Sequence, residues 1–174
     1  MPMPTPPPIP PPTPLSLRPF HPTHDAPLLR TWVTSHAELM TWAGPSFSWP
    51  LDEAQLTAYA AEPGRHTWTA VTPAGDPVGH ASIAGTRLGR VLIAPEARGR
   101  GLGETLVSLT VSRAFGELNL PQLGLGVWAH NTAAIRLYEK LGFRTHDTLK
   151  DVEEVDGVPW TAHQMKLIAP DPSQ

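Results

Sequence analysis

The fold of this chain is decided by one stretch, Val91-Leu92-Ile93-Ala94-Pro95-Glu96-Ala97-Arg98-Gly99-Arg100-Gly101-Leu102-Gly103-Glu104-Thr105-Leu106-Val107. An apolar run ends at a proline, a loop rich in glycine and arginine follows, and a helical pattern comes next. Glycines allow backbone N–H groups to approach a ligand closely, and a helix N-terminus carries about half a positive charge. We therefore interpret the stretch as a strand, an anion-binding turn and a helix that together hold a diphosphate.

The spacing of the glycines separates this loop from two common nucleotide loops. A Walker A loop requires a lysine after its last glycine, whereas Gly103 is followed by Glu104 and Thr105. A dinucleotide loop requires the pattern Gly-x-Gly-x-x-Gly, whereas here Gly99, Gly101 and Gly103 alternate with other residues. The loop therefore favours a diphosphate of another kind. Taken alone, it is also explained by a tight turn with surface arginines.

The composition restricts the class of protein. The chain has 174 residues, 40% apolar residues and a net charge of −3, which indicate one globular domain and no general affinity for nucleic acid. Because it has no cysteine, disulfides, thiolate catalysis and Cys-based zinc sites are excluded, no metal is expected, and a cytoplasmic location is favoured. No apolar run approaches the length of a membrane span, and the first residues lack the pattern of a signal peptide, so we expect no membrane association.

Hydrophobic periodicity predicts a mixed α/β domain of the α+β type. Residues 1–14 hold nine of the 22 prolines and are expected to form a disordered tail, the domain to span residues 15–168, and residues 169–174 to be a C-terminal tail. The predicted strands are 15–19, 67–71, 78–84, 88–93, 123–129, 143–153 and 158–167. The predicted helices are 23–33, 52–61, 103–118 and 131–141, with a second short helix around 35–42.

These elements predict a mixed sheet with helices on its faces. Thr23 or Asp25 is expected to cap the first helix, because their side chains accept backbone N–H groups. Asn119 is expected to adopt a left-handed conformation after the long helix. Asp156-Gly157 is typical of a type I′ hairpin turn.

Two motifs resemble those of the GNAT superfamily of N-acetyltransferases. The pattern Arg98-x-x-Gly101-x-Gly103, between a strand and a helix, resembles motif A, whose loop holds the pyrophosphate of coenzyme A in that superfamily. Residues 127–143, which read VWAHNTAAIRLYEKLGF, look like motif B. The two motifs occur in the order and at the separation of the family, and the resemblance covers residues 15–167. It implies the GNAT fold, a mixed and mostly antiparallel sheet of six to seven strands that is flanked by about four helices.

The resemblance implies how acetyl-CoA would be held. Val91, Leu92 and Ile93 would present their backbone to the pantetheine arm, and their strand would splay from the strand 123–129 to admit the thioester. Asn131 would contact the pantetheine. The loop that would enclose the pyrophosphate consists of Arg98, Gly99, Arg100, Gly101, Leu102, Gly103 and Glu104. One of its two arginines would also meet the 3′-phosphate.

Tyr138 is the residue that we expect to act as general acid. In the superfamily this tyrosine protonates the departing thiolate. Asn131 and Tyr138 are also two helical turns apart, which puts both on the same side of a helix. A phenol with a pKa near 10 can donate a proton to a thiolate whose conjugate acid has a pKa of about 8.5. Without the motif, Tyr138 would be interpreted as a core aromatic.

The sequence leaves the general base open. Many relatives carry a glutamate where this chain has Gly126, and others carry an acid on the strand 88–93, which here contains Arg90 and no acid. His80 or His130 could replace the acid, because imidazole has a suitable pKa, although either pattern also fits an ordinary histidine. A water chain, or an acceptor that binds as the neutral amine, would need no base.

The acceptor site is expected next to the strand 88–93. Arg90 either pairs with a carboxylate of the substrate or lies exposed at a strand edge. Trp42, Phe47 and Trp49 belong to a region that forms a wall of the acceptor site in the family, so they either line that site or pack in the core.

We therefore expect an enzyme that transfers an acetyl group directly from acetyl-CoA to a primary amine, on a small molecule or at a protein or peptide N-terminus. Direct transfer is favoured because no cysteine could carry the acyl group. The alternative is an acyl-CoA-binding regulatory domain with weak or no catalysis, because neither usual base position is filled. Dimers are common in the family, so a homodimer is left open, and the acceptor amine is not identified.

Overall fold

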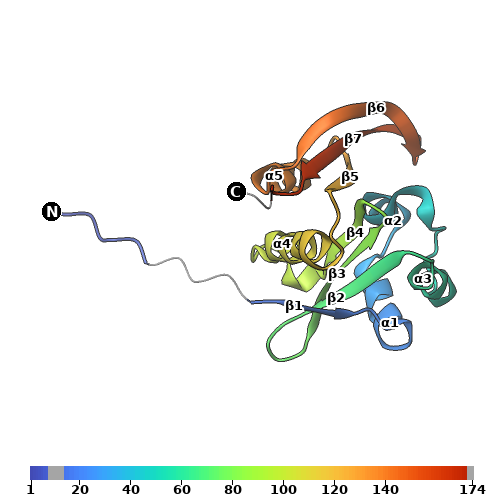
Figure 1. The fold of residues 1–174 in the computed structure, drawn as a ribbon, viewed down its shortest axis with the longest axis horizontal. Helices are drawn as coiled ribbons and strands as arrows, with labels where there is room; N and C mark the ends of the chain where they lie inside the picture. Colours follow the sequence, from blue (N-terminus) through green and yellow to red (C-terminus); the bar gives the residue numbers. More distant parts are fainter. Residues whose placement is uncertain (8–13, 172–174) are drawn as a thin grey trace.

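Seven strands form one mixed sheet in the order β1-β2-β3-β4-β5-β7-β6 (Figure 1). The computed structural model describes residues 1–7 and 14–171. The strands are β1 (Ser16–Pro19), β2 (Arg65–Val71), β3 (Pro77–Ala84), β4 (Arg87–Ile93), β5 (Gln122–Trp128), β6 (Arg144–Val155) and β7 (Val158–Ile168). The α-helices are α1 (Pro22–Trp32), α2 (His36–Ala43), α3 (Glu53–Ala60), α4 (Leu102–Ser112) and α5 (Thr132–Lys140). The predicted α+β class and mostly antiparallel sheet are confirmed, and the described ranges contain an α-helix for each of the five predicted, including the second short one.

The predicted turns and boundaries agree well with the structure. Asn119, Asp156 and Gly157 have φ values of 52°, 51° and 82°, which confirms the left-handed residue after the long helix and the hairpin turn. That helix ends earlier than predicted, because α4 gives way to a π-helical turn at Arg113–Glu117. Of the predicted tails, residues 8–13 and 172–174 lie outside the described residues, and residues 1–7 are exposed and belong to no element.

The start of α1 differs from the prediction. The helix begins at Pro22 with His21 as its N-cap, and the Asp25 side chain lies inside the first turn, where it accepts the N–H of His21 at 2.7 Å. Asp25 is buried, and both of its oxygens accept from Arg18 at 2.8 Å. Burial alone would raise the pKa of Asp25, but the hydrogen bonds from Arg18, His21 and Thr69 outweigh it and lower that pKa. Asp25 therefore joins α1 to the sheet and does not cap the helix.

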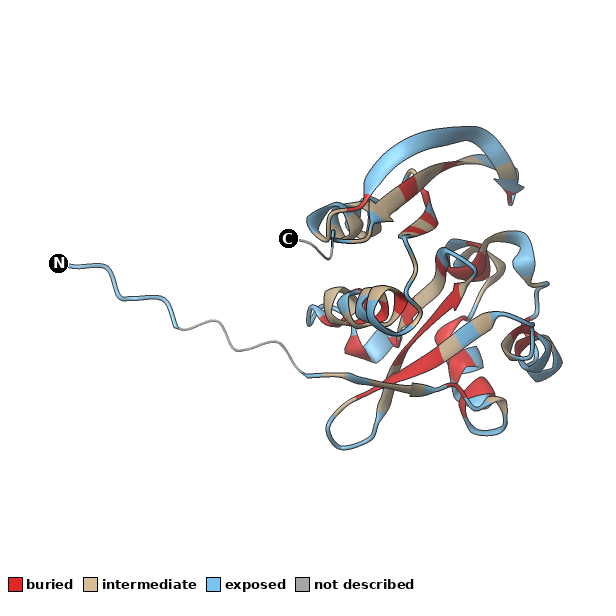
Figure 2. Ribbon diagram, viewed as in Figure 1, coloured by how far each residue is buried: buried red, intermediate tan, exposed pale blue. Residues whose placement is uncertain are grey.

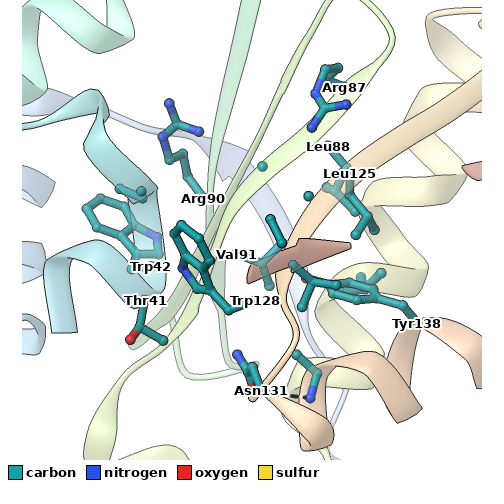
Figure 3. Close-up of a pocket in the computed structure, with 18 of the residues that line it drawn as sticks. Thr41, Trp42, Arg87, Leu88, Arg90, Val91, Leu125, Trp128, Asn131 and Tyr138 are labelled. Carbon is teal, nitrogen blue, oxygen red and sulfur yellow. Dashed lines mark hydrogen bonds between the residues drawn. The ribbon is translucent and has the colours of Figure 1, made fainter. Parts of the chain in front are cut away.

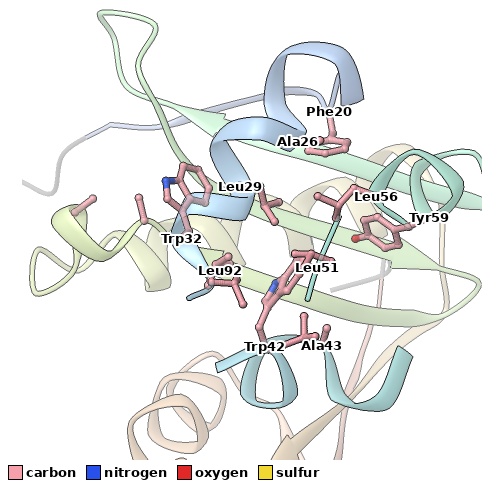
Figure 4. Packing of buried hydrophobic residues seen from close by; sticks show 14 of the residues in the cluster. Phe20, Ala26, Leu29, Trp32, Trp42, Ala43, Leu51, Leu56, Tyr59 and Leu92 are labelled. Carbon is pink, nitrogen blue, oxygen red and sulfur yellow. The ribbon is translucent and has the colours of Figure 1, made fainter. Parts of the chain in front are cut away.

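Helices cover both faces of the sheet. A core between α1, α2, α3 and β4 contains the apolar residues labelled in Figure 4, among them Leu29, Trp42, Leu56 and Leu92. A second core joins α4 and α5 to β5 and β7, with Phe143 and Met165 fully buried. By contrast, β6 is exposed along most of its length, as its pale colour in Figure 2 shows. In the described ranges, no helix is both long and apolar enough to span a bilayer.

The parallel strands β4 and β5 separate almost at once. Their register contains the single pair Arg87↔Gly124, with one hydrogen bond of 2.8 Å from the N–H of Gly124 to the carbonyl of Thr86. On its other side β4 pairs with β3, but His80 pairs with Leu92 and Ser82 with Gly89, so β4 carries one extra residue there. Such a bulge bends a strand and interrupts its ladder. The predicted splay between these strands is confirmed.

Candidate active site

A cavity of about 560 Å³ opens where β4 and β5 diverge. Its walls come mainly from α2, β4 and the consecutive elements β5 and α5 (Figure 3). Its lining includes Trp42, Arg65, Arg87, Arg90, Val91, Ile93, Trp128, Asn131, Leu137 and Tyr138. Of the strand predicted to face the pantetheine, Val91 and Ile93 line the cavity, whereas Leu92 is buried in the first core.

The bulge in β4 directs Arg90 into the cavity. Arg90 has a φ of 56°, a left-handed conformation that costs a side-chain-bearing residue about 1 kcal/mol or more. Its guanidinium donates to the Ser46 hydroxyl at 2.7 Å and lies 5.9 Å from the ring centroids of both Phe47 and Tyr59. Burial lowers the pKa of Arg90, and the buried Nε has no hydrogen-bond partner. Arg90 therefore lies in the cavity and not exposed at a strand edge.

Helix α5 brings Asn131 and Tyr138 to the same wall. Asn131 caps the helix, and its side-chain oxygen accepts the N–H of Ala134 at 3.3 Å. Because that bond uses the oxygen, the amide NH₂ group stays available to a ligand, and Figure 3 shows it turned away from the Ala134 bond. The Tyr138 ring packs edge to face against Phe143, with centroids 5.7 Å apart. The expected shared face of the helix is therefore observed.

Tyr138 is held as a neutral phenol. Its side chain is half-buried, and the surrounding apolar residues disfavour the phenolate, which raises the pKa of Tyr138 to about 12. Among the described residues, no hydrogen bond joins the hydroxyl to another protein group. The group thus keeps its proton across the physiological range and can donate it to a molecule in the cavity.

The glycine loop lies beyond the carboxyl end of β4. Gly99 and Gly101 have φ values of 80° and 73°, and Gly101 is the N-cap of α4. Within the described chain, the N–H groups of Gly99, Arg100 and Gly101 have no backbone acceptor, and the first N–H groups of any helix lack one. The side chains of Arg98 and Arg100 donate only to the carbonyls of Ile93 and Glu96, at 3.2 and 3.4 Å. Together these donors can hold a diphosphate.

The candidate bases do not reach the cavity. His80 is buried beneath the sheet, where its Nε2 lies 2.9 Å from the Tyr59 hydroxyl, and burial lowers the pKa of His80 to about 3. His130 is exposed and packs against Trp160, with ring centroids 4.6 Å apart. At Gly126 an added Cβ would lie 3.2 Å from Gln164 Nε2 and 3.3 Å from Arg87 Nη2, so these two side chains fill the position of the expected glutamate.

Of the three aromatic residues expected in the acceptor wall, only Trp42 lines the cavity. Phe47 stacks behind it, with centroids 5.6 Å apart, and carries the guanidinium of Arg90. Trp49 is 42% exposed and lies outside the lining. Trp128, which the sequence analysis did not select, faces Trp42 across the cavity and donates its indole N–H to the carbonyl of Met40 at 2.8 Å (Figure 3).

Two further lining arginines were missed, Arg65 and Arg87. Arg87 comes just before the predicted strand, and its place opposite Gly124 depends on a parallel pairing that no local pattern shows. Trp128 stands inside the quoted motif, and its alternation with Val127 could have placed it on the opposite face of β5. In residues 1–7 and 14–171, no group of three or more His, Asp or Glu side chains is placed to hold a metal ion.

Comparison with known proteins finds similarity to acetyltransferases. The model of the acetyltransferase (GNAT) family matches residues 36–143. Peptidyl-lysine N-acetyltransferase YjaB of Salmonella typhimurium is 35% identical over 77 residues, which are 44% of this chain and 49% of that protein. Mycothiol acetyltransferase of Streptomyces griseus is 45% identical over 64 residues, which are 35% of this chain and 20% of that protein. The chain thus spans about half, or less, of the length of these relatives.

The fold is shared with a solved structure. Spermidine N-acetyltransferase from Vibrio cholerae, in complex with CoA and spermine, superposes with a TM-score of 0.77 at 19% identity. The match covers 88% of this chain and 95% of that one.

The two tyrosines of the chain provide a direct test of this site, because burial also raises the pKa of Tyr59 to about 12. At pH 10.5 we expect less than about 10% phenolate in the folded protein, against about three quarters in urea, where the pKa is near 10. Since the folded pKa values are the higher ones, this stabilising contribution is complete below pH 10 and is lost as the pH rises towards 12. Absorbance at 295 nm measures the phenolate. A tyrosine that ionises near pH 10 in folded Tyr59→Phe protein would contradict the burial of Tyr138.

Proposed function

Because the chain belongs to the GNAT acetyltransferase family, we propose that it transfers the acetyl group of acetyl-CoA to a primary amine. The observation that carries the proposal is the gap between β4 and β5. The glycine loop, with its unpaired backbone N–H groups and its two arginines, lies beyond one end of the gap, and the Tyr138 phenol lies on its wall. A regulatory domain that only binds acyl-CoA would not need a neutral phenol open to the cavity.

The residues around the gap fit coenzyme A. The loop from Arg98 to Glu104 would hold the pyrophosphate through its free N–H groups, with added charge from its arginines. Beyond the single pair Arg87↔Gly124, the β5-facing backbone of β4 has no strand partner in the described chain, so Val91 and Ile93 can bond the amides of the pantetheine arm. Asn131 offers its NH₂ group on the opposite side.

Tyr138 would act as the general acid. When bound, acetyl-CoA supplies the acetyl group as a thioester, whose C–S bond breaks as the C–N bond to the amine forms. Tyr138 holds a proton on its phenol oxygen and delivers it to the departing sulfur, then recovers a proton from water. The amine loses its own proton to water, because no Asp, Glu or His is among the described residues that line the cavity. We therefore propose that the acceptor enters as the neutral amine.

The relatives differ in what they acetylate. Their names specify peptidyl-lysine, mycothiol and, for the structural neighbour, spermidine. These acceptors differ in charge and size, so the cavity of this chain, and not its relatives, must indicate the acceptor.

Replacing a loop glycine tests the diphosphate site. Gly101→Ala adds no clash, since nothing lies within 4 Å of its Cβ, but it strains a residue whose φ is 73°. We expect the loop to relax and the Kd for acetyl-CoA, measured by calorimetry, to rise about 5- to 10-fold, as for a loss of roughly 1 kcal/mol.

Gly75→Ala is the matched control, because Gly75 has a φ of 89°, an equally open surrounding and a place in the β2–β3 turn. It should lose similar stability in urea and keep its affinity. Equal Kd values for the two variants would remove the loop from the binding site.

Removing the phenol hydroxyl tests the general acid. Tyr138→Phe should lower kcat by at least about 100-fold, because general acids contribute that much or more. The Kd for acetyl-CoA should stay within threefold, since the ring and its contact with Phe143 remain. Rates are measured by thiol release on a panel of amines. An unchanged kcat would show that Tyr138 is not the acid; binding of acetyl-CoA without any acetylation by the wild type would favour the regulatory domain.

The absence of a base from the described lining makes a prediction about pH. Below the pKa of the acceptor amine, kcat/KM should rise about tenfold per pH unit, in step with the neutral amine, and level off only near that pKa. Measurements from pH 6 to 10 with two amines of different pKa provide the test. A plateau that begins near pH 6.5 for both amines would instead indicate a histidine base.

A further inference from the structure

The amino end of β4 makes one part of the cavity strongly cationic. Arg65, Arg87 and Arg90 are all in the lining, and the described lining contains no Asp or Glu. Arg65 is already neutralised, because it pairs with Glu62 at 2.6 Å and also donates to the Ser82 hydroxyl at 3.1 Å. The two remaining guanidinium groups therefore give this part of the cavity its net charge.

Arg90 has no counter-ion. Its described partners are the Ser46 hydroxyl and the faces of two aromatic rings, all of which are uncharged. A half-buried guanidinium with neutral partners and a buried, unpartnered Nε is costly, and a bidentate carboxylate or phosphate is the group that repays such a cost best. The strained φ of 56° adds to that cost and suits a residue held for binding.

Arg87, the first residue of β4, reaches the same space by extending over β5. Its Nη2 would lie 3.3 Å from a Cβ on Gly126, and its Nη1 3.7 Å from one on Gly124, so the guanidinium extends over the side-chain-free part of that strand. No ion pair or hydrogen bond joins it to another described residue. Figure 3 shows Arg87 and Arg90 at one end of the pocket, with Asn131 at the other.

These charges are too far from the loop to serve the diphosphate. The anion-binding loop follows the carboxyl end of β4 at Ile93, whereas Arg90 lies about 10 Å and Arg87 about 20 Å back along the strand, at 3.3 Å per residue. Tyr138, where transfer would occur, lines the same cavity. The arginines are thus on the acceptor side of the reaction.

We propose that the acceptor is a small primary amine that carries an anionic group, a carboxylate or a phosphate, which binds to Arg90 with help from Arg87. The proposal rests on the acetyl transfer proposed above. A volume of about 560 Å³ is in the range of small-molecule sites. The same charges repel a second ammonium, so polyamines are rejected.

The test compares acceptors that differ only at the end remote from the amine. ω-Amino carboxylates of two to five carbons are set against alkylamines and diamines of the same length, with spermidine added. The kcat/KM of O-phosphoethanolamine relative to ethanolamine shows whether a phosphate is preferred, and the ω-amino carboxylates show the same for a carboxylate. Thiol release gives kcat/KM per neutral amine, and we expect the anionic acceptors to exceed the matched diamines by at least 100-fold.

Variants then assign the preference to the arginines. Arg90→Gln should lower kcat/KM for the anionic acceptors by about 10- to 100-fold, as for a lost charge-assisted pair, and change it less than threefold for alkylamines. Arg90→Lys should recover part of the loss, and Arg87→Gln should cause a smaller one. The control is Arg136→Gln, which removes an exposed charge on α5 outside the lining and should change nothing.

Two outcomes would overturn the proposal. A preference for diamines or spermidine would do so, and so would an anionic preference that survives Arg90→Gln while urea unfolding shows the variant to be folded. Calorimetric binding of the same probes to the protein saturated with CoA separates this proposal from the enzymatic one. Carboxylates that bind through Arg90 without being acetylated would support the anion site and refute the acetyl transfer.

Discussion

The site depends on a break in the pairing of two central strands. β4 and β5 are parallel neighbours, yet they share only the pair Arg87↔Gly124, and backbone groups beyond it need other partners. The two halves of the sheet stay together through contacts around the gap. Trp128 of β5 donates to the carbonyl of Met40 in α2, and Glu104 of α4 pairs with Lys140 of α5 at 2.9 Å. At Gly103 an added Cβ would lie 3.3 Å from Leu137, so glycine permits the close approach of α4 and α5. The gap is therefore held open by packing at both ends.

The bulge in β4 links the fold to the chemistry of the cavity. One extra residue interrupts the ladder with β3, bends the strand and turns the Arg90 side chain towards the gap. The strand thereby separates the two regions that we propose bind anions. Backbone N–H groups form the one beyond its carboxyl end, and they suit the diffuse charge of a diphosphate. Guanidinium groups form the one at its amino end, and their planar donors suit a single carboxylate or phosphate. Tyr138 lies on the wall between them, among apolar side chains that keep it protonated.

Local spacing was enough to predict the parts of the site that lie on one element. The glycine loop is one short segment, and Asn131 and Tyr138 are two helical turns apart on one helix, so each could be predicted from local spacing. The GNAT resemblance then connected the loop with the helix. The acceptor side could not be predicted in the same way. Arg87 lies next to Gly126 because β4 pairs in parallel with β5, although α4 separates these two strands in the sequence. Trp128 of β5 faces Trp42, which belongs to α2. The role expected for Asp25 as a cap was wrong, because its carboxylate pairs with Arg18 of β1 and accepts from Thr69 of β2, and these contacts with the sheet compete with local capping.

Acceptor selection and the missing base have a common physical origin. Nearby positive charge disfavours an ammonium ion and lowers the pKa of a bound amine. One carboxylate on the acceptor cancels the charge of Arg90, but Arg87 stays unpaired and Arg65 is already matched by Glu62. We therefore expect a net positive field at the bound amine, which favours the neutral form in which we propose that the acceptor enters. A carboxylate at position 126 would oppose this effect and would compete with the acceptor for Arg87, whose guanidinium is within 3.3 Å of that Cβ position. We therefore propose that glycine at 126 and arginine at 87 and 90 are parts of one electrostatic arrangement, in which the same charges bind the anionic group of the acceptor and favour its neutral amine.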